Sequence, residues 1–329
     1  METRVLIHKQ DFSWKRFFLQ WEWMLVLLFI AIHVMNMNLS EYYWDSANLR
    51  DATMGFLDKA FIVLPMVFIM ILGDIDISVA SIIALSSTVM ADLYNHGVPM
   101  SFAMLICLGV GILCGFINGL LIVKFKELSA VIVTLSTMII YRGIAYIMLE
   151  DQAAGSFPEW FSFLGWGYVG PIPFILIVFA IFAAGFGWLL HKTKFGRSVY
   201  AMGSNSTASR FSGIQVNKIK MMVFTLTGLM SAIAALFLAS RMGSTRPNVA
   251  TGYELDVIAM VVLGGISTAG GKGRMIGAIL AIFLIGFLRY GLGLVNVQAQ
   301  VLLVIIGLLL IVAVAVPKLK FGKGLSRKG

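Results

Sequence analysis

The uncharged stretch SFAMLICLGVGILCGFINGLLI, Ser101–Ile122, is 22 residues long. An α-helix of that length measures about 33 Å, enough to cross the roughly 30 Å hydrocarbon core of a bilayer. Apolar and polar residues do not alternate along the stretch, as they would in a strand of a membrane β-barrel. Since lipid tolerates only helices and closed barrels, the stretch predicts a transmembrane helix.

Similar apolar runs recur from about residue 21 to residue 316, separated by short polar breaks. The chain has 329 residues, of which 59% are hydrophobic and 12% charged, with a mean hydropathy of +0.92. A soluble domain of this size needs more charge. The sequence therefore predicts an all-α, polytopic membrane protein with about ten spans, near 20–37, 53–72, 76–92, 101–122, 128–148, 172–190, 221–240, 253–267, 276–290 and 299–316.

The charges divide between the two sides of such a bundle. With ten spans and both termini inside, the inner segments hold most of the 25 Lys and Arg residues, whereas the outer segments and their margins hold half of the 16 acidic ones. This sorting follows the positive-inside rule and predicts cytoplasmic termini. The net charge of +9 is thus a topology signal and excludes nucleic acid as a partner. A few basic residues, among them Lys59, Arg142, Arg241 and Arg289, fall near outer ends, where they are expected to snorkel.

The expected organisation has three parts. Residues 1–19 form a cytoplasmic N-terminal segment, residues 20–316 the transmembrane domain with a large inner loop at 191–220, and residues 317–329 a basic cytoplasmic tail. Internal symmetry is faint: Leu72-Gly73-Asp74-Ile75 and Leu263-Gly264-Gly265-Ile266 each close one apolar run and open another.

The segment LGGISTAGGKGR, residues 263–274, resembles a nucleotide-binding loop at first sight. A P-loop reads G-x-x-x-x-G-K-[ST] between a strand and a helix, but here Ile266 takes the place of the first glycine and Gly273 that of the hydroxyl residue. The chain is therefore not expected to hydrolyse ATP. A tight, basic, cytoplasmic turn remains, with the candidate residues Gly264, Gly265, Gly270, Gly271, Lys272 and Gly273.

The inner loop at 191–220 contains a segment too polar to span. Residues 204–211 can form a short helix, with Ser204 or Asn205 as N-cap and Gly213 as the stop. Such a helix suits contact with a soluble partner, and equally an ordinary solvated connector.

Carboxylates within the membrane are costly unless they are paired, hydrated or buried in protein. Asp74 and Asp76 flank the break between the second and third spans, and Asp76 or Ser78 could cap the third. Capping is favoured over direct contact with a solute. In the fourth span Gly111, Gly115 and Gly119 form a small-residue stripe for close helix packing, within the subunit by default and at a dimer seam as the alternative.

Three segments together resemble one family. They are Gly73-Asp74-Ile75-Asp76-Ile77-Ser78, the segment from Gly196-Arg197 through Asn205 to Ser212-Gly213-Ile214, and Leu263-Gly264-Gly265-x-Ser267 with Gly270-Gly271-Lys272-Gly273. In order and spacing they are similar to the permease subunits of bacterial ATP-binding-cassette (ABC) importers for sugars. This group includes ribose, galactose, xylose, rhamnose and autoinducer-2 permeases. The sequence departs from the family at Asp74, Ser209 and Ser129-Ala130, where the family has glycine, alanine and a proline-containing start.

The resemblance implies a protein of the bacterial cytoplasmic membrane without a cofactor, a metal or enzymatic activity. Its partners would be a second permease (a copy or a relative), two ABC ATPase subunits or one fused tandem ATPase, an extracytoplasmic solute-binding protein and the lipid bilayer. The coupling helix that rests on the ATPase would match residues 201–214, with the candidates Gly196, Arg197, Gly203, Asn205, Ala208, Ser212 and Gly213. The pathway or gate candidates are Asp74, Asp76, Ser78, Asn118, Thr134 and Arg142.

The alternative function is an ion-coupled secondary transporter with Asp74, Asp76 and Arg142 as the relay. ATP dependence separates the two functions. A membrane enzyme lacks support, since the four histidines are scattered and no nucleophile–base pair or metal-ligand spacing occurs.

Overall fold

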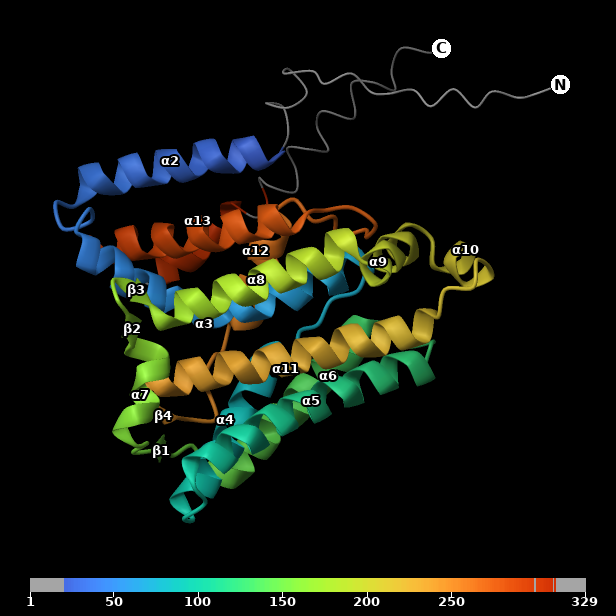
Figure 1. The fold of residues 1–329 in the computed structure, drawn as a ribbon, viewed down its shortest axis with the longest axis horizontal. Helices are drawn as coiled ribbons and strands as arrows, with labels where there is room; N and C mark the ends of the chain where they lie inside the picture. Colours follow the sequence, from blue (N-terminus) through green and yellow to red (C-terminus); the bar gives the residue numbers. More distant parts are fainter. Residues whose placement is uncertain (1–20, 299, 310, 312–329) are drawn as a thin grey trace, which may run out of the picture.

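A computed structural model describes residues 21–298, 300–309 and 311 as a bundle of helices (Figure 1). Within this part of the chain, seven helices are long and apolar enough to cross a membrane. They are α2 (Trp21–Leu39), α3 (Ser46–Ile71), α5 (Met100–Lys124), α6 (Ala130–Leu149), α8 (Phe174–Lys192), α11 (Val216–Met242) and α13 (Met275–Leu294). The N-terminal segment 1–19 and the tail 317–329 lie outside the described residues.

Each of the ten predicted spans has a helix, but not all of these helices are full spans. Helix α4 (Val79–Asn95) has 17 residues and α12 (Tyr253–Leu263) only 11, and the last predicted span is described only in part, over Gln300–Leu309. An 11-residue helix measures about 16 Å, roughly half of the hydrocarbon core. The predicted span at 253–267 is therefore wrong as a complete crossing: α12 is a half-helix, preceded by the non-helical segment 243–252.

Short elements cover the connections. Helix α7 (Glu159–Trp166) lies in the long loop after α6, and α9 (Lys194–Ser204) and α10 (Ser206–Phe211) follow α8. Two antiparallel strand pairs complete the fold, β1 (Ala154–Gly155) with β4 (Ser244–Thr245), and β2 (Tyr168–Val169) with β3 (Ile172–Pro173).

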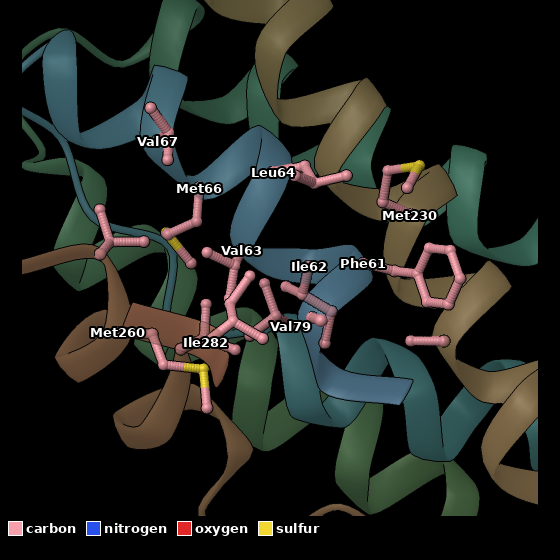
Figure 2. Close-up of a cluster of buried hydrophobic side chains, with 14 of the residues drawn as sticks. Phe61, Ile62, Val63, Leu64, Met66, Val67, Val79, Met230, Met260 and Ile282 are labelled. Carbon is pink, nitrogen blue, oxygen red and sulfur yellow. The ribbon is translucent and has the colours of Figure 1, made fainter. Parts of the chain in front are cut away.

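Helix α3 is the centre of the bundle. Every residue from Phe56 to Leu72 is buried, which explains why the sequence shows no polar face there. Figure 2 shows six side chains of α3 among side chains from four other helices, namely Val79 of α4, Met230 of α11, Met260 of α12 and Ile282 of α13. Helices α4 and α12 are thus held against the central helix by apolar packing.

The connections gather at two ends (Figure 1). Helices α9 and α10 mark one end, which also holds the connections 125–129 and 264–274; we call it the basic end. Helix α7 and the four strands mark the opposite end. The segments predicted to be inner, with Lys124, Lys126, Arg210 and Lys272 among their basic residues, fall at the basic end.

The faint internal symmetry has a structural counterpart. After α3, Gly73 N donates to Met70 O and Asp74 N to Ile69 O; after α12, Gly265 N donates to Val262 O and Ile266 N to Val261 O. Both helices end in this pattern around a glycine of positive φ, +82° at Gly73 and +84° at Gly265. The structure pairs Gly73 with Gly265, one residue away from the match that the sequence suggests.

The glycine stripe of α5 packs within the subunit, as the default interpretation predicted. Gly111 and Gly115 lie against Gly228 of α11, so close that a Cβ on Gly115 would meet the carbonyl oxygen of Phe224 and come within 2.9 Å of Gly228 Cα. Backbone thus lies directly against backbone along this contact, which leaves no room for a methyl group.

We expect Gly115→Ala to lower the midpoint of thermal unfolding of the detergent-purified chain, because overpacking costs about 1–3 kcal/mol. Gly109→Ala on the same helix is the matched control, since a Cβ there has no atom within 4 Å. Equal unfolding midpoints for the two variants would contradict the close contact of α5 with α11.

Candidate functional site

The three segments that carry the sequence resemblance meet at the basic end. Gly271 N donates a hydrogen bond of 2.8 Å to Ile71 O at the end of α3. A Cβ on Gly203 of α9 would collide with Ile71 O and lie 2.6 Å from Gly271 N. Gly270, with φ of +84°, also packs against Gly203 O and Ile71 O. We call Ile71, Gly203, Gly270 and Gly271 the glycine junction, in which three chain segments touch through their backbones.

A tyrosine reinforces this junction. Tyr200 Oη of α9 donates to Gly273 O at 2.6 Å, which ties α9 to the turn between α12 and α13. Burial raises the pKa of the Tyr200 phenol, against a smaller opposing effect of Arg274, so the hydroxyl stays a neutral donor. Met275 N also donates to His191 Nε2 at 3.3 Å, which links the start of α13 to the end of α8.

The glycine-rich turn has the predicted tight geometry. Gly265, Gly270, Gly271 and Gly273 all have positive φ, and Gly264 lies against the backbone of Gly277 and Ala278. Lys272 is exposed, and its carbonyl accepts from Ser267 N at 3.0 Å. The glycines of the turn therefore pack in the glycine junction, and the Lys272 side chain extends from the turn into solvent.

The short helix predicted at 204–211 is present as α10. Asn205 is its N-cap and accepts from Ala208 N at 2.9 Å, and Gly213 follows its end with φ of +83°. Ser212 Oγ donates back to Ala208 O at 3.0 Å. These three predicted coupling residues thus shape the helix ends.

The remaining coupling candidates fall into two groups. Gly196 and Gly203 are packing positions, because a Cβ on either would collide with a backbone carbonyl oxygen. Arg197 and Ala208 are exposed. Sequence reasoning missed Phe211, whose side chain is 88% exposed at the end of α10. The sequence contained a signal for its exposure, because an aromatic residue within a polar segment has no neighbouring apolar residues with which to form a core.

Four of the six pathway candidates gather around the break after α3. Asp76 is buried and accepts from Ser78 N (2.9 Å) and Ser78 Oγ (2.6 Å), and Asn118 Nδ2 donates to Ser78 Oγ at 2.7 Å. Thr134 Oγ1 of α6 donates to Ala130 O at 2.9 Å within its own helix and accepts from Ile77 N at 3.2 Å.

A residue that the sequence did not single out completes the group. Tyr141 Oη donates to Asn118 Oδ1 and to Cys114 O, both at 3.1 Å. Ser78 stands at the N-cap of α4 but makes no side-chain capping bond; Asp76 supplies the bond to the backbone instead. We call Asp76, Ser78, Asn118, Thr134 and Tyr141 the break network.

The other two candidates have different partners. Asp74 forms an ion pair of 2.6 Å with Lys220 of α11. Arg142 Nη1 donates to Pro247 O and Val249 O, both at 2.7 Å, in the segment before α12. Arg142 therefore does not snorkel, and it does not form a relay with Asp74 and Asp76.

Three further basic residues expected to snorkel are instead paired inside the protein. Lys59 Nζ lies 2.8 Å from Asp256 Oδ2, with both side chains 7% exposed, and Arg289 donates to the other oxygen of Asp256. Arg241 pairs at 2.7 Å with Asp58.

These charges form one group, because Tyr253 connects its two halves. Tyr253 Oη donates to Asp58 Oδ2 at 3.2 Å, and its ring lies 4.3 Å from Lys59 Nζ, within reach of a cation–π contact. We call this group the charge network; it joins α3, α11, α12 and α13 at the point where half-helix α12 begins. Sequence reasoning missed it because its members lie up to 231 residues apart, from Asp58 to Arg289.

A short half-helix beside a buried central helix, with polar groups at the breaks, is typical of a membrane permease. Residues 53–314 match the family described as "Branched-chain amino acid transport system / permease component". The chain belongs to this family.

Curated relatives align over most of their length. The ribose import permease protein RbsC of Bacillus subtilis is 37% identical over 298 residues, covering 89% of this chain and 91% of the relative. The L-arabinose transport system permease protein AraH of Escherichia coli is 36% identical, covering 95% and 94%. The autoinducer 2 import system permease protein LsrD of Yersinia enterocolitica is 34% identical, covering 80% and 81%. No solved structure matches the chain.

The matches confirm the predicted family and the predicted location in the bacterial inner membrane. The protein is a multi-pass permease of the bacterial inner membrane, of the type that serves ABC importers. The ion-coupled alternative finds no support among these relatives.

We expect Asp256→Asn to destabilise the chain strongly, because it leaves Lys59 and Arg289 without a buried counter-charge. Breaking a buried ion pair costs about 3–5 kcal/mol. The measurement is the thermal unfolding midpoint in detergent. Glu41→Gln is the control, since Glu41 is exposed and forms no ion pair among the described residues. A midpoint for Asp256→Asn like that of the control would mean that the charge network does not hold α12.

Proposed function

We propose that the chain forms the membrane pathway of an ABC importer for a sugar or sugar-like solute, with its basic end in the cytoplasm. The relatives named for ribose, arabinose and autoinducer 2 support this substrate class. Their names differ, so the class rather than one sugar is proposed. The basic residues at the end with α9 and α10 support the orientation, because cytoplasmic loops retain Lys and Arg.

In this proposal α10 is the coupling helix, and Phe211 is its main contact with the ATPase. An aromatic side chain that is 88% exposed on a short, capped helix at the basic end is typical of an anchor that enters a partner's pocket. Arg197 and Ala208 are exposed in the same region and would add to the contact.

The observation that carries the proposal is the glycine junction. A displacement of α10 reaches α9 over one residue, Asn205. From α9 it passes through Gly203 to the end of α3, and through Tyr200 to the turn before α13. Since these contacts are made by backbone and short hydrogen bonds, they leave little slack. A rigid-body shift at α10 would thus move the end of α3 and the turn before α13.

The pathway residues remain candidates within this proposal. The hydrogen bonds of the break network favour a structural role, in which Asp76 and Thr134 hold the extended backbone after α3. The Asp74–Lys220 pair is half-buried at the basic end, beside the glycine junction, and would lie near an inner gate. Breaking and re-forming this ion pair would change the charge at the inner gate without a large motion.

The complete importer in this proposal has a second permease, which is a copy of this chain or a relative. It also has two ABC ATPase subunits or one fused ATPase, and an extracytoplasmic binding protein that delivers the solute. Catalysis belongs to the ATPase. Isolated in vesicles, the chain is expected to move no solute and split no nucleotide.

We expect Phe211→Ala to weaken binding of the cognate ATPase by about tenfold or more, the size of a typical anchor residue. ATP-driven uptake should fall with it, while the variant still inserts and unfolds at the wild-type temperature. Co-purification of the ATPase and uptake in cells measure the two effects. Tyr42→Ala is the matched control, because Tyr42 is 65% exposed at the opposite end.

Two results would count against the proposal. An unchanged affinity for the ATPase would exclude α10 as the coupling contact. Uptake that persists without ATP and follows the proton gradient would exclude an ABC importer altogether.

A further inference from the structure

A cavity of about 420 Å³ opens at the basic end, beside the candidate coupling helix. Its lining comes from the break after α3, the connection between α5 and α6, helix α10 and the start of α11. These are segments far apart in the sequence that the fold brings together. The cavity is distinct from the break network, which lies deeper and is closed by its own hydrogen bonds.

The charges on the cavity wall are unbalanced. Lys126, Arg210 and Lys220 line it, with Asp74 as the single carboxylate, and Asp74 is already paired with Lys220 at 2.6 Å. Lys126 and Arg210 have no hydrogen bond or ion pair of their side chains with the described residues. The lining thus carries a net charge of about +2, which remains after its internal pair is formed.

Two long helices add partial positive charge to the same space. Helix α6, of 20 residues, begins at Ala130, and Ser129 at its N-cap accepts only one backbone bond, from Ile132 N at 3.3 Å. Helix α11, of 27 residues, begins at Val216 without a side-chain cap. Ser129, Val131, Val216 and Asn217 all line the cavity, so both N-termini face it. Unsatisfied amides and helix dipoles at such ends attract anions.

We propose that this cavity binds a phosphate group, as inorganic phosphate, a phosphorylated small molecule or an anionic lipid headgroup. The charge of +2 matches a phosphate dianion, and the serine and asparagine side chains supply further hydrogen bonds. The positive-inside rule explains why basic residues occur on this side, but not why three of them converge on one hollow with two helix N-termini. The bound group would lie between α10 and the break after α3. The site does not depend on the proposed coupling role of α10.

Binding can be measured on the full-length chain, purified without other subunits and held in phosphatidylcholine nanodiscs. Isothermal titration with inorganic phosphate, against sodium chloride at equal ionic strength, should give saturable binding. Lys126→Gln and Arg210→Gln should each weaken it about fivefold, the effect of one unit charge at 4 Å in water. Asp74→Asn should strengthen it, because it removes the opposing charge.

Lys218→Gln is the matched control, since Lys218 is exposed on the same helix as Lys220 but does not line the cavity. Its affinity for phosphate should equal that of the wild type. The Lys126, Arg210 and Lys218 variants are checked for an unchanged unfolding midpoint, which is expected because these three side chains are exposed.

A second arm identifies the source of the group. In nanodiscs that contain phosphatidic acid, native mass spectrometry reports the lipid retained by the chain. Retention that falls with Lys126→Gln and Arg210→Gln, and under added phosphate, supports a lipid headgroup in the cavity. Binding of phosphate that phosphatidic acid does not displace supports a soluble ligand.

The proposal fails if neither phosphate nor phosphatidic acid binds. It also fails if Lys218→Gln weakens binding as much as the cavity variants do, because the attraction would then come from the whole basic surface rather than from this site.

Discussion

Backbone groups in a membrane need hydrogen-bond partners inside the protein, and this constraint governs the two places where the helices break. The segments 72–78 and 243–252 are extended or irregular, so their backbone groups lack the partners that a continuous helix would provide. Both receive some of their partners from one helix, α6. Thr134 Oγ1 accepts from Ile77 N, and Arg142 donates to Pro247 O and Val249 O. These two residues lie about two turns apart, on the same side of α6.

Buried charged side chains face the same requirement for partners inside the protein. An unpaired charge in hydrocarbon costs several kcal/mol, so the buried ones must meet each other. The charge network places Asp256 between Lys59 and Arg289, and Asp58 against Arg241, just where α12 begins. Apolar packing holds the C-terminal part of α12, and ion pairs hold its start. Both contributions stabilise a half-helix of only 11 residues in this position.

The sequence predicted the features that depend on neighbouring residues. Apolar runs located the helices, Asn205 and Gly213 marked the ends of α10, and glycine spacing predicted close packing of α5. It failed where a partner distant in the chain decides the outcome. Hydropathy could not reveal that α12 stops at Leu263, because the residues that follow are still apolar or small. Pattern alone could not show that Lys59 meets Asp256, 197 residues away, instead of reaching for the interface.

In the candidate site too, local sequence predicts the turns, but only the fold shows why glycine is required at these positions. Each motif glycine is unremarkable in its own segment, where it permits a turn or ends a helix. In the glycine junction they share one role: Gly203 and Gly271 allow α9 and the turn before α13 to contact Ile71 O directly. A side chain at either position would separate the segments and introduce rotatable bonds between them. Because the contact is made by backbone, the connection from α10 to the break after α3 is short and rigid. A displacement of α10 can therefore be transmitted to the break.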